Sequence, residues 1–270
     1  MMKHFLICIA LLVLVTSKGI AQSFNVIAFF TAKDDQAHIS FVKEANRFFP
    51  KIANQYQFRY DTTSNWDNLN AAFLANYQVV LFLDTRPEKP SQRQAFEEYI
   101  NKGGAWIGFH FAAFALNNSL YSQDWDWYHQ TFLGSGQYKS NTWRPTSAIL
   151  KVEKRKHFST KSLPKKFTSS VNEWYRWEND LRTNRDIEIL LSIDAESFPL
   201  GTGPNPSEIW QSGYYPVAWS NKKYRMLYFN MGHNDIDYEN NANKELSFTF
   251  ENDIQNRFVA NALLGFGKGK

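Results

Sequence analysis

The amino-acid sequence predicts an α/β fold built on an open, doubly wound and mostly parallel sheet. Three observations lead to this prediction. Almost wholly apolar runs recur along the first 110 residues, stretches with helical spacing separate them, and proline or paired glycines mark helix ends. Runs that are apolar at every position are typical of central parallel strands, which are buried on both faces. Their alternation with helices is typical of a doubly wound sheet.

The elements of the first half follow from local patterns. Ser23–Thr31 is a predicted strand because it contains an unbroken apolar run. A helix is predicted over His38–Phe49, where apolar residues recur at helical spacing up to Pro50. Ser91–Lys102 is a second predicted helix, which ends at Gly103–Gly104. Further strands are predicted at Tyr56–Tyr60, Tyr77–Leu83 and Ala105–Phe109.

The second half of the sequence is predicted to add further strands to the same sheet, joined by long polar or aromatic loops. The predicted strands are Ser147–Val152, Ile187–Ser192, Pro216–Ser220 and Arg225–Asn230. A final helix is expected from Thr249 to about Leu264, and Pro199–Ser207 is a loop by its glycine and proline content. We therefore expect a single α/β domain over residues 23–270.

Residues 1–22 have the three parts of a secretory signal peptide. Lys3 and His4 open a polar start, an apolar run covers Phe5–Val15, and small residues lead to Ala21. The apolar run is shorter than the roughly 20 residues that span a bilayer. We expect cleavage near Ala21 or Gln22, residence in the periplasm or outside the cell, and no stable membrane insertion afterwards. The alternative is an uncleaved anchor at the membrane surface.

Cysteine content and charge exclude several classes of function. The only cysteine, Cys8, lies in the predicted signal peptide, so the mature chain would have no disulfide and no cysteine nucleophile. The formal charge of +4 falls to +2 when residues 1–22 are removed, because Lys3 and Lys18 leave with no acidic residue. The remaining basic residues are scattered, which does not favour nucleic-acid binding.

Aromatic residues are frequent and often stand beside polar ones. They make up 17% of the chain, with nine tryptophans. Aromatic rings flanked by hydrogen-bonding side chains suit the faces of sugars. Trp127 and Tyr175, which lie in such segments, are therefore expected to bind a carbohydrate ligand, while at least half of the aromatic rings should fill the core.

Three histidines follow predicted strands or open the helix after one. His110 comes directly after the strand Ala105–Phe109, His233 follows the strand Arg225–Asn230, and His38 lies past the first strand. Ligands collect at the carboxyl ends of parallel strands, so these side chains are expected to converge there. His110 and His233 are predicted to be catalytic, with His38 and Asp235 binding substrate. Structural histidines held by hydrogen bonds are the alternative.

Glu173 is the candidate carboxylate for proton transfer. It lies among aromatic residues, where partial burial is expected to raise its pKa and to suit an acid or base. The alternative is a structural ion pair with Arg176 or another basic residue.

Motifs of other chemistries are absent from the sequence. No GxSxG elbow, GxGxxG turn or GxxxxGK[ST] loop occurs, which disfavours serine hydrolases, dinucleotide binding and phosphate-loop chemistry. HxH, HExxH and CxxC are absent as well, so no local motif indicates a metal. If a divalent metal such as zinc is bound, His110 and His233 are its expected ligands.

Several short motifs, in this order, resemble the ThuA-like (trehalose-utilisation) family. They are Gly108–Ala112 (GFHFA), Trp127–Gly136, Glu173–Tyr175 (EWY), Pro216–Trp219 (PVAW) and the Gly232–His233 pair, with His38 as an early histidine. The resemblance covers nearly the whole predicted mature chain. One departure is that Gly136–Asn141 (GQYKSN) has no histidine, where members often carry one.

The resemblance implies a flavodoxin-like fold of the class I glutamine amidotransferase type, without the amidotransferase nucleophile. It also implies a role in disaccharide or keto-sugar metabolism. We therefore expect an exported enzyme that acts on a sugar by proton transfer. A non-catalytic carbohydrate-binding protein on the same scaffold is the alternative. The sequence names neither the sugar nor the oligomeric state.

Overall fold

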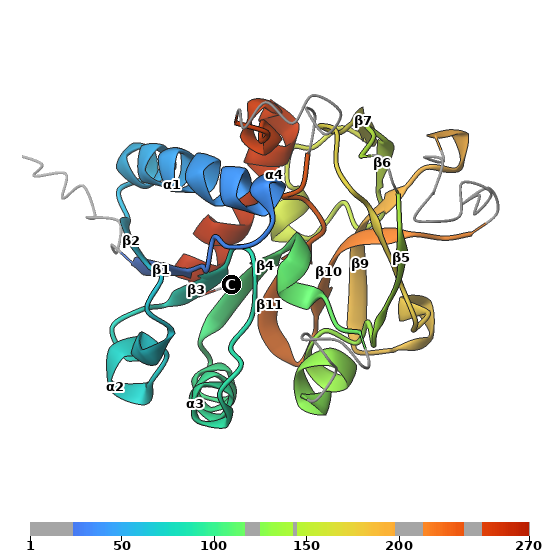
Figure 1. Cartoon of the computed structure of the whole chain (residues 1–270). Helices are drawn as coiled ribbons and strands as arrows, with labels where there is room; N and C mark the ends of the chain where they lie inside the picture. The colour runs from blue at the N-terminus through green and yellow to red at the C-terminus, as the bar shows by residue number, and fades with distance from the viewer. Residues whose placement is uncertain (1–23, 117–124, 143–144, 198–212, 235–244, 270) are drawn as a thin grey trace, which may run out of the picture.

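The computed structural model describes residues 24–116, 125–142, 145–197, 213–234 and 245–269. A nine-stranded sheet with strand order β2-β1-β3-β4-β11-β10-β9-β6-β7 forms its centre (Figure 1). In chain order these strands are β1 (Asn25–Phe29), β2 (Arg59–Thr63), β3 (Val79–Phe82), β4 (Ala105–Phe109), β6 (Ile149–Val152), β7 (Lys166–Thr168), β9 (Ile187–Ile193), β10 (Pro216–Asn221) and β11 (Tyr224–Phe229).

The sheet has a parallel part and an antiparallel part. Strands β2, β1, β3, β4 and β11 pair in parallel. The strands from β11 through β10, β9 and β6 to β7 pair antiparallel. A large sheet with a parallel core, flanked by helices and extended by C-terminal strands, confirms the predicted fold class. All carboxyl ends of the parallel strands therefore meet at one edge.

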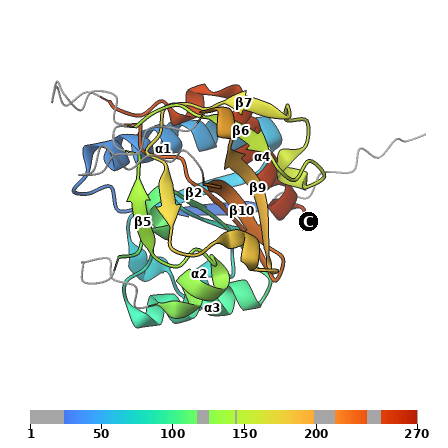
Figure 2. The same cartoon turned by 90° about the vertical axis from the view of Figure 1, so that its right-hand side faces the viewer.

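Helices cover both faces of the sheet. Figures 1 and 2 show α1 (Gln36–Tyr56) and α4 (Asp253–Gly267) on one face, and α2 (Ala71–Leu74) and α3 (Pro90–Asn101) on the other. Residues of β1 alternate between the two cores: Val26 and Ala28 pack beneath α1 and α4, whereas Ile27 and Phe29 face α2 and α3. Burial of both faces explains the unbroken apolar run that predicted this strand.

Helix α1 extends beyond its predicted end at Pro50, and the predicted strand Tyr56–Tyr60 begins later, at Arg59. A proline inside a helix costs about 3 kcal/mol because it removes a backbone hydrogen bond. The continuation past Pro50 buries Ile52 and Ala53 in the core, and this burial offsets the cost. The helix ends at Gln57, whose backbone is left-handed.

Two short strands form a separate antiparallel pair that the sequence does not indicate. These are β5 (Tyr138–Asn141) and β8 (Tyr175–Trp177). Segments of three or four residues carry too little periodicity to be recognised. They matter to the site because Glu173 lies two residues before β8.

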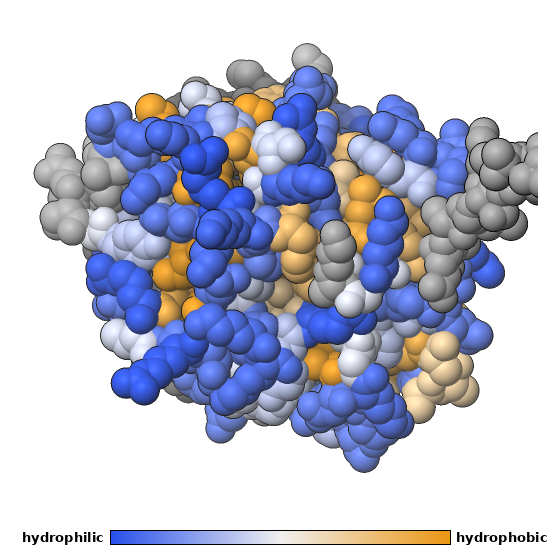
Figure 3. Space-filling view, turned by 180° about the vertical axis from the view of Figure 1, so that it is seen from behind, coloured by the Kyte–Doolittle hydropathy of each residue, from blue (hydrophilic) through white to orange (hydrophobic). Residues whose placement is uncertain are grey.

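Some predictions fall outside the described residues, namely the signal peptide, the loop Pro199–Ser207 and Asp235. No helix among the described residues is long and apolar enough to cross a membrane. Seen from behind, the surface is mostly hydrophilic, with hydrophobic residues showing between polar ones (Figure 3).

Candidate functional site

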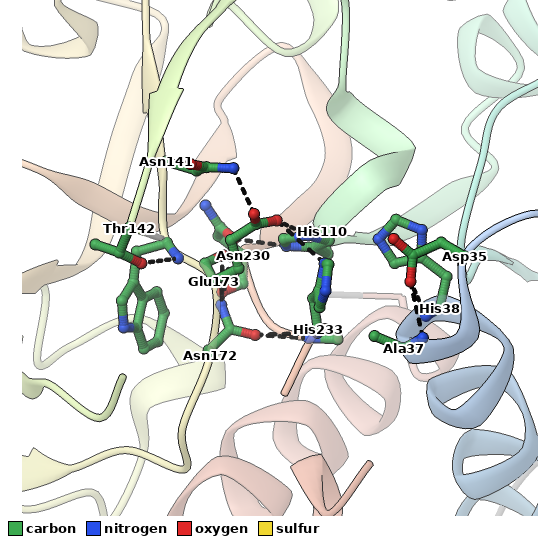
Figure 4. Close-up of polar contacts among 12 residues, drawn as sticks. Asp35, Ala37, His38, His110, Asn141, Thr142, Asn172, Glu173, Asn230 and His233 are labelled. Atoms are coloured by element: carbon green, nitrogen blue, oxygen red, sulfur yellow. Dashed lines mark hydrogen bonds and ion pairs between the residues drawn. The ribbon is translucent and has the colours of Figure 1, made fainter. Parts of the chain in front are cut away.

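Three histidines and one glutamate meet at the carboxyl edge of the parallel strands. His38 lies in the first turn of α1 after β1, His110 directly follows β4, and His233 comes shortly after β11. Glu173 reaches the same place from the segment before β8. Figure 4 shows these side chains pointing toward one another. The predicted convergence of the histidines is thus present in the structure.

The Glu173 carboxylate contacts two of the imidazoles. Its Oε2 atom lies 3.1 Å from His233 Nδ1 and 3.4 Å from His110 Nε2. The Asn141 side-chain amide donates a hydrogen bond to Oε1. His38 completes the cluster, with its ring centroid 4.8 Å from that of His233 and 5.4 Å from that of His110. All four side chains are buried.

Unusual backbone conformations position two of the histidines. His110 has φ +38°, in the left-handed region that residues with a Cβ rarely adopt. Gly232, just before His233, has φ +137°, and a Cβ there would lie 3.2 Å from the Phe41 ring. Left-handed residues of this kind concentrate at functional sites, where the surrounding structure compensates their cost.

Two asparagines connect the Glu173 segment to the residues after β4 and β11 that carry His110 and His233. Asn172 Oδ1 accepts hydrogen bonds from the backbone N–H groups of Gly232 (3.0 Å) and His233 (3.2 Å). The backbone N–H of Glu173 donates to His233 O at 2.9 Å. Asn230 satisfies its neighbours when its Nδ2 donates to His110 Nδ1 (3.0 Å) and its Oδ1 accepts from the Tyr175 backbone N–H (2.7 Å).

Burial keeps two of the imidazoles neutral. The pKa of His38 falls to about 3, chiefly because the ring is buried and also because His233 and His110 repel its charged form. Burial likewise lowers the pKa of His110, although the neighbouring Glu173 carboxylate opposes this shift. Neutral imidazoles offer lone pairs to a proton or to a metal.

The pKa of Glu173 moves opposite to the sequence-based expectation. Burial does act to raise it, but attraction to His233 and hydrogen bonding from His110 and His233 outweigh burial and hold the pKa well below its ordinary value. Glu173 is therefore ionised at neutral pH. It can accept a proton or balance a positive charge, but it is not an acid there.

A pocket of about 670 Å³ opens beside the cluster, at the point where α1 and the β3–α3 connection leave the sheet in opposite directions. His38 lies at its wall, together with Asp35 and Phe111. Trp66, Asp84 and Arg86 line other parts of it. This is the switch point at which open α/β sheets bind ligands, and the volume is in the usual range for small-molecule sites.

The other predicted binding residues do not line this pocket. Tyr175 is buried and packs on the His110 ring, with centroids 4.1 Å apart, so it supports the cluster from behind. Trp127 lies in the helical turn Trp127–Phe132 and stacks on Phe132 at 5.0 Å. Among the described residues its ring also contacts Phe96, Trp125 and Tyr224, none of which belongs to the cluster.

Sequence reasoning missed Asp35, Trp66, Asp84 and Arg86 as pocket residues. Asp35 caps α1, and its side chain accepts hydrogen bonds from Ala37 and His38 N–H groups. Asp84 and Arg86 follow the apolar strand β3 closely. They were predictable as pocket residues, because ligands bind at the carboxyl ends of parallel strands. Trp66 lies in a short turn after β2 with no comparable signal.

His38, His110 and His233 are the described residues that could hold a metal ion, since one ligand atom from each lies within 4.8 Å of the others. The sequence nominated His110 and His233 for this role, and the structure adds His38.

A family model and a solved structure both relate this chain to the same family. The family described as trehalose utilisation (ThuA) matches residues 26–248. A ThuA-like protein from Bacteroides uniformis is 34% identical, with a TM-score of 0.77 and coverage of 90% of this chain and 91% of that one. No curated protein matches.

More distant structures show the fold alone. A ThuA-like protein from Parabacteroides merdae has 14% identity and a TM-score of 0.58, with coverage of 91% of this chain and 90% of that one. A β-galactosidase from Rahnella has 10% identity and a TM-score of 0.52, covering 90% of this chain but 31% of the enzyme.

Asp84 should make stability depend on pH. Burial raises its pKa to about 6, whereas an unfolded aspartate titrates near 3.9. The native state then binds more protons between about pH 4 and 6, so stability falls as pH rises through this window. The Asp84→Asn variant lacks this titration. Between pH 4 and 7 its free energy of unfolding in urea, measured relative to that of the wild type, should therefore rise by up to about 3 kcal/mol.

The exposed Asp67, which lines the same pocket, provides the matched control. Asp67→Asn should show no such gain over that range. A difference between Asp84→Asn and the wild type that stays constant from pH 4 to 7 would contradict the raised pKa.

Proposed function

The chain belongs to the trehalose-utilisation (ThuA) family, and from this premise we propose that it is an exported enzyme of carbohydrate metabolism. It acts on a disaccharide or keto-sugar by proton transfer. The observation that carries the proposal is the polar pocket at the switch point, because its wall contains His38, which packs against the His110 and His233 rings of the buried cluster. Such a site offers both room for a sugar and groups that move protons.

The charges around the pocket favour a neutral sugar. Five carboxylates line it, from Asp34, Asp35, Asp67, Asp84 and Glu88, against three basic side chains, from Lys33, Arg86 and Lys89. A sugar phosphate or uronic acid would meet an excess of like charge. Sugar hydroxyls, in contrast, can pair with both carboxylates and cations.

Trp66 supplies an aromatic surface for the sugar. Its ring is half-buried against Phe29 and Phe82, with centroids 5.3 Å apart in both cases. Its Nε1 donates to Thr31 Oγ1 at 3.0 Å, which fixes the ring orientation. An anchored ring at a pocket wall can pack on the C–H face of a sugar.

The chain's own groups account for proton transfer at the inner end of the pocket. Burial acts to raise the pKa of Asp35, but the nearby His233 and hydrogen bonds from the Ala37 and His38 backbone N–H groups outweigh burial and lower it, so Asp35 is held ionised. It reaches the pocket beside His38 and can accept a proton from a carbon next to a carbonyl. Behind them, the Glu173 carboxylate balances positive charge that develops on the imidazoles.

The sugar platform can be tested with two tryptophans. Trp66→Ala should weaken binding of the neutral sugar by about tenfold, because the ring contributes packing area and a stacking surface. Trp127→Ala, which removes a half-buried ring outside the pocket, is the matched control and should leave sugar affinity unchanged. Thermal-shift screening against neutral disaccharides, keto-sugars and sugar phosphates identifies the ligand, and calorimetry measures affinity. Equal losses in both variants would exclude Trp66 as the platform.

Catalysis and simple binding are separated by substitutions in the cluster. His110→Ala and Glu173→Gln should each lower turnover about 10²–10⁴-fold in an enzyme. A non-catalytic sugar-binding protein on this scaffold, the alternative function, would lose only modest affinity. His157→Ala and Glu98→Gln, outside the cluster, serve as controls, with melting temperature reporting on folding. Unchanged turnover and binding in both cluster variants would show that the site is wrongly assigned.

Export rests on the predicted signal peptide of residues 1–22. When the full chain is expressed in a Gram-negative host, the mature protein should begin near Gln22 or Ser23. Intact mass and N-terminal sequencing of the periplasmic and culture fractions measure this. A protein that retains Met1, or one recovered with membranes, would argue for the uncleaved anchor instead.

A further inference from the structure

We propose that His38, His110 and His233 bind a divalent metal ion of the zinc class at the inner end of the pocket. One nitrogen from each ring lies within 4.8 Å of the others. Zinc–nitrogen bonds of about 2.0–2.1 Å place neighbouring ligand atoms about 3.3 Å apart in a tetrahedron. The rings would have to move so that the nitrogens come to that spacing around a bound ion. Three protein ligands and one open position is the arrangement of catalytic zinc sites.

A ring nitrogen of His38 is available to a metal. His38 Nε2 is buried and has no hydrogen-bond partner among the described residues. His110 Nε2 lies 3.4 Å from Glu173 Oε2, a long polar contact that a metal ion could replace. A buried polar atom without a hydrogen bond is costly to the folded state. A metal ion at the centre of the cluster would satisfy these nitrogens together.

The surrounding charge and access also fit a cation. Glu173 Oε2 lies 3.1 Å from His233 Nδ1 and 3.4 Å from His110 Nε2, so its carboxylate would offset part of the charge of a metal ion held there. His38 lines the pocket, so an ion held by the three histidines would lie next to the space open to a substrate. When bound there, such a metal polarises a sugar carbonyl or hydroxyl oxygen as a Lewis acid. Metal binding does not depend on which sugar the pocket takes.

Asn230 controls how readily His110 can serve as a ligand. When the Asn230 amide is oriented so that its Oδ1 accepts from the Tyr175 N–H, its Nδ2 faces His110 Nδ1, and the ring proton then lies on Nε2. Ligation through Nε2 moves that proton to Nδ1, where it needs an acceptor. The Asn230 amide can supply one only by turning its oxygen away from the Tyr175 N–H. An aspartate at position 230 would accept hydrogen bonds from both groups at once.

The experiment titrates the mature protein, stripped with a chelator, with Zn²⁺ alone in a calorimeter, and with Co²⁺ to report coordination geometry by visible absorption. We expect one ion per chain and an absorption spectrum of four-coordinate cobalt. His38→Ala, His110→Ala and His233→Ala should each weaken zinc binding at least 100-fold, and His38→Gln repeats the test where alanine impairs folding.

His157→Ala is the matched control, because His157 lies outside the cluster and bonds Ser159. It should bind zinc as the wild type does. Absence of stoichiometric zinc binding by the wild type, or zinc binding that survives in every cluster variant, would overturn the proposal. Since no sugar is present, such a failure is distinct from a failure of the proposed carbohydrate activity, which sugar binding and turnover measure.

The Asn230→Asp variant tests the three-histidine ligand set through an expected gain in zinc affinity rather than a loss. Loss of a group that hydrogen-bonds a metal ligand typically costs about 10–100-fold in metal affinity. Supplying the missing acceptor should therefore make this variant bind zinc at least tenfold more tightly than the wild type. Melting temperature without metal confirms that the variant folds. Zinc affinity unchanged in folded Asn230→Asp would show that His110 does not ligate through Nε2, and the three-histidine set would be wrong.

Discussion

The contact of the buried Glu173 carboxylate with two imidazoles is the interaction on which the rest of the site depends. An ionised carboxylate that leaves water is stable only when close partners compensate the lost hydration. Here His110, His233 and the Asn141 amide provide that compensation. These partners come from distant parts of the chain, so the carboxylate is satisfied only when both halves of the sheet are in place. The site therefore also links the two halves of the sheet.

The strand order explains how residues far apart in the chain become neighbours. Strand β11 pairs in parallel with β4, although more than 110 residues separate them. Their carboxyl ends place His110 and His233 side by side. The intervening antiparallel strands lead the chain outward and back, and they bring Glu173 to the same edge before β8. Asn172 then ties that segment to the backbone of Gly232 and His233.

The scaffold itself says little about chemistry, because similar folds carry different activities. A β-galactosidase from Rahnella contains a region of this fold at 10% identity, which is a likeness of architecture alone. The functional argument rests on the local chemistry: neutral imidazoles, an ionised buried carboxylate, and a polar pocket whose carboxylates outnumber its cations. The family relationship adds carbohydrate metabolism as the context.

The sequence alone determined the elements that depend on local patterns. Strands buried on both faces are apolar at every position, so β1, β3 and β4 were predictable, and His110 at the end of β4 followed from that. Short strands such as β5 and β8 carry too few residues for any periodicity. The sequence also predicted the convergence of the histidines, since parallel carboxyl ends share one edge.

Tertiary structure decided what depends on long-range neighbours. The sequence around Glu173, rich in aromatic residues, predicted a raised pKa. In the folded protein the pKa is lowered because His110 and His233, from distant segments, contact the carboxylate. The course of α1 through Pro50 depended on the core that Ile52 and Ala53 fill. Trp66 lines the pocket and Trp127 does not. The sequence could not decide between them, because a ring beside polar residues is equally compatible with a pocket wall and with the core. Local sequence fixes which groups are available, whereas burial and pairing between distant segments determine their electrostatics and their access to ligand.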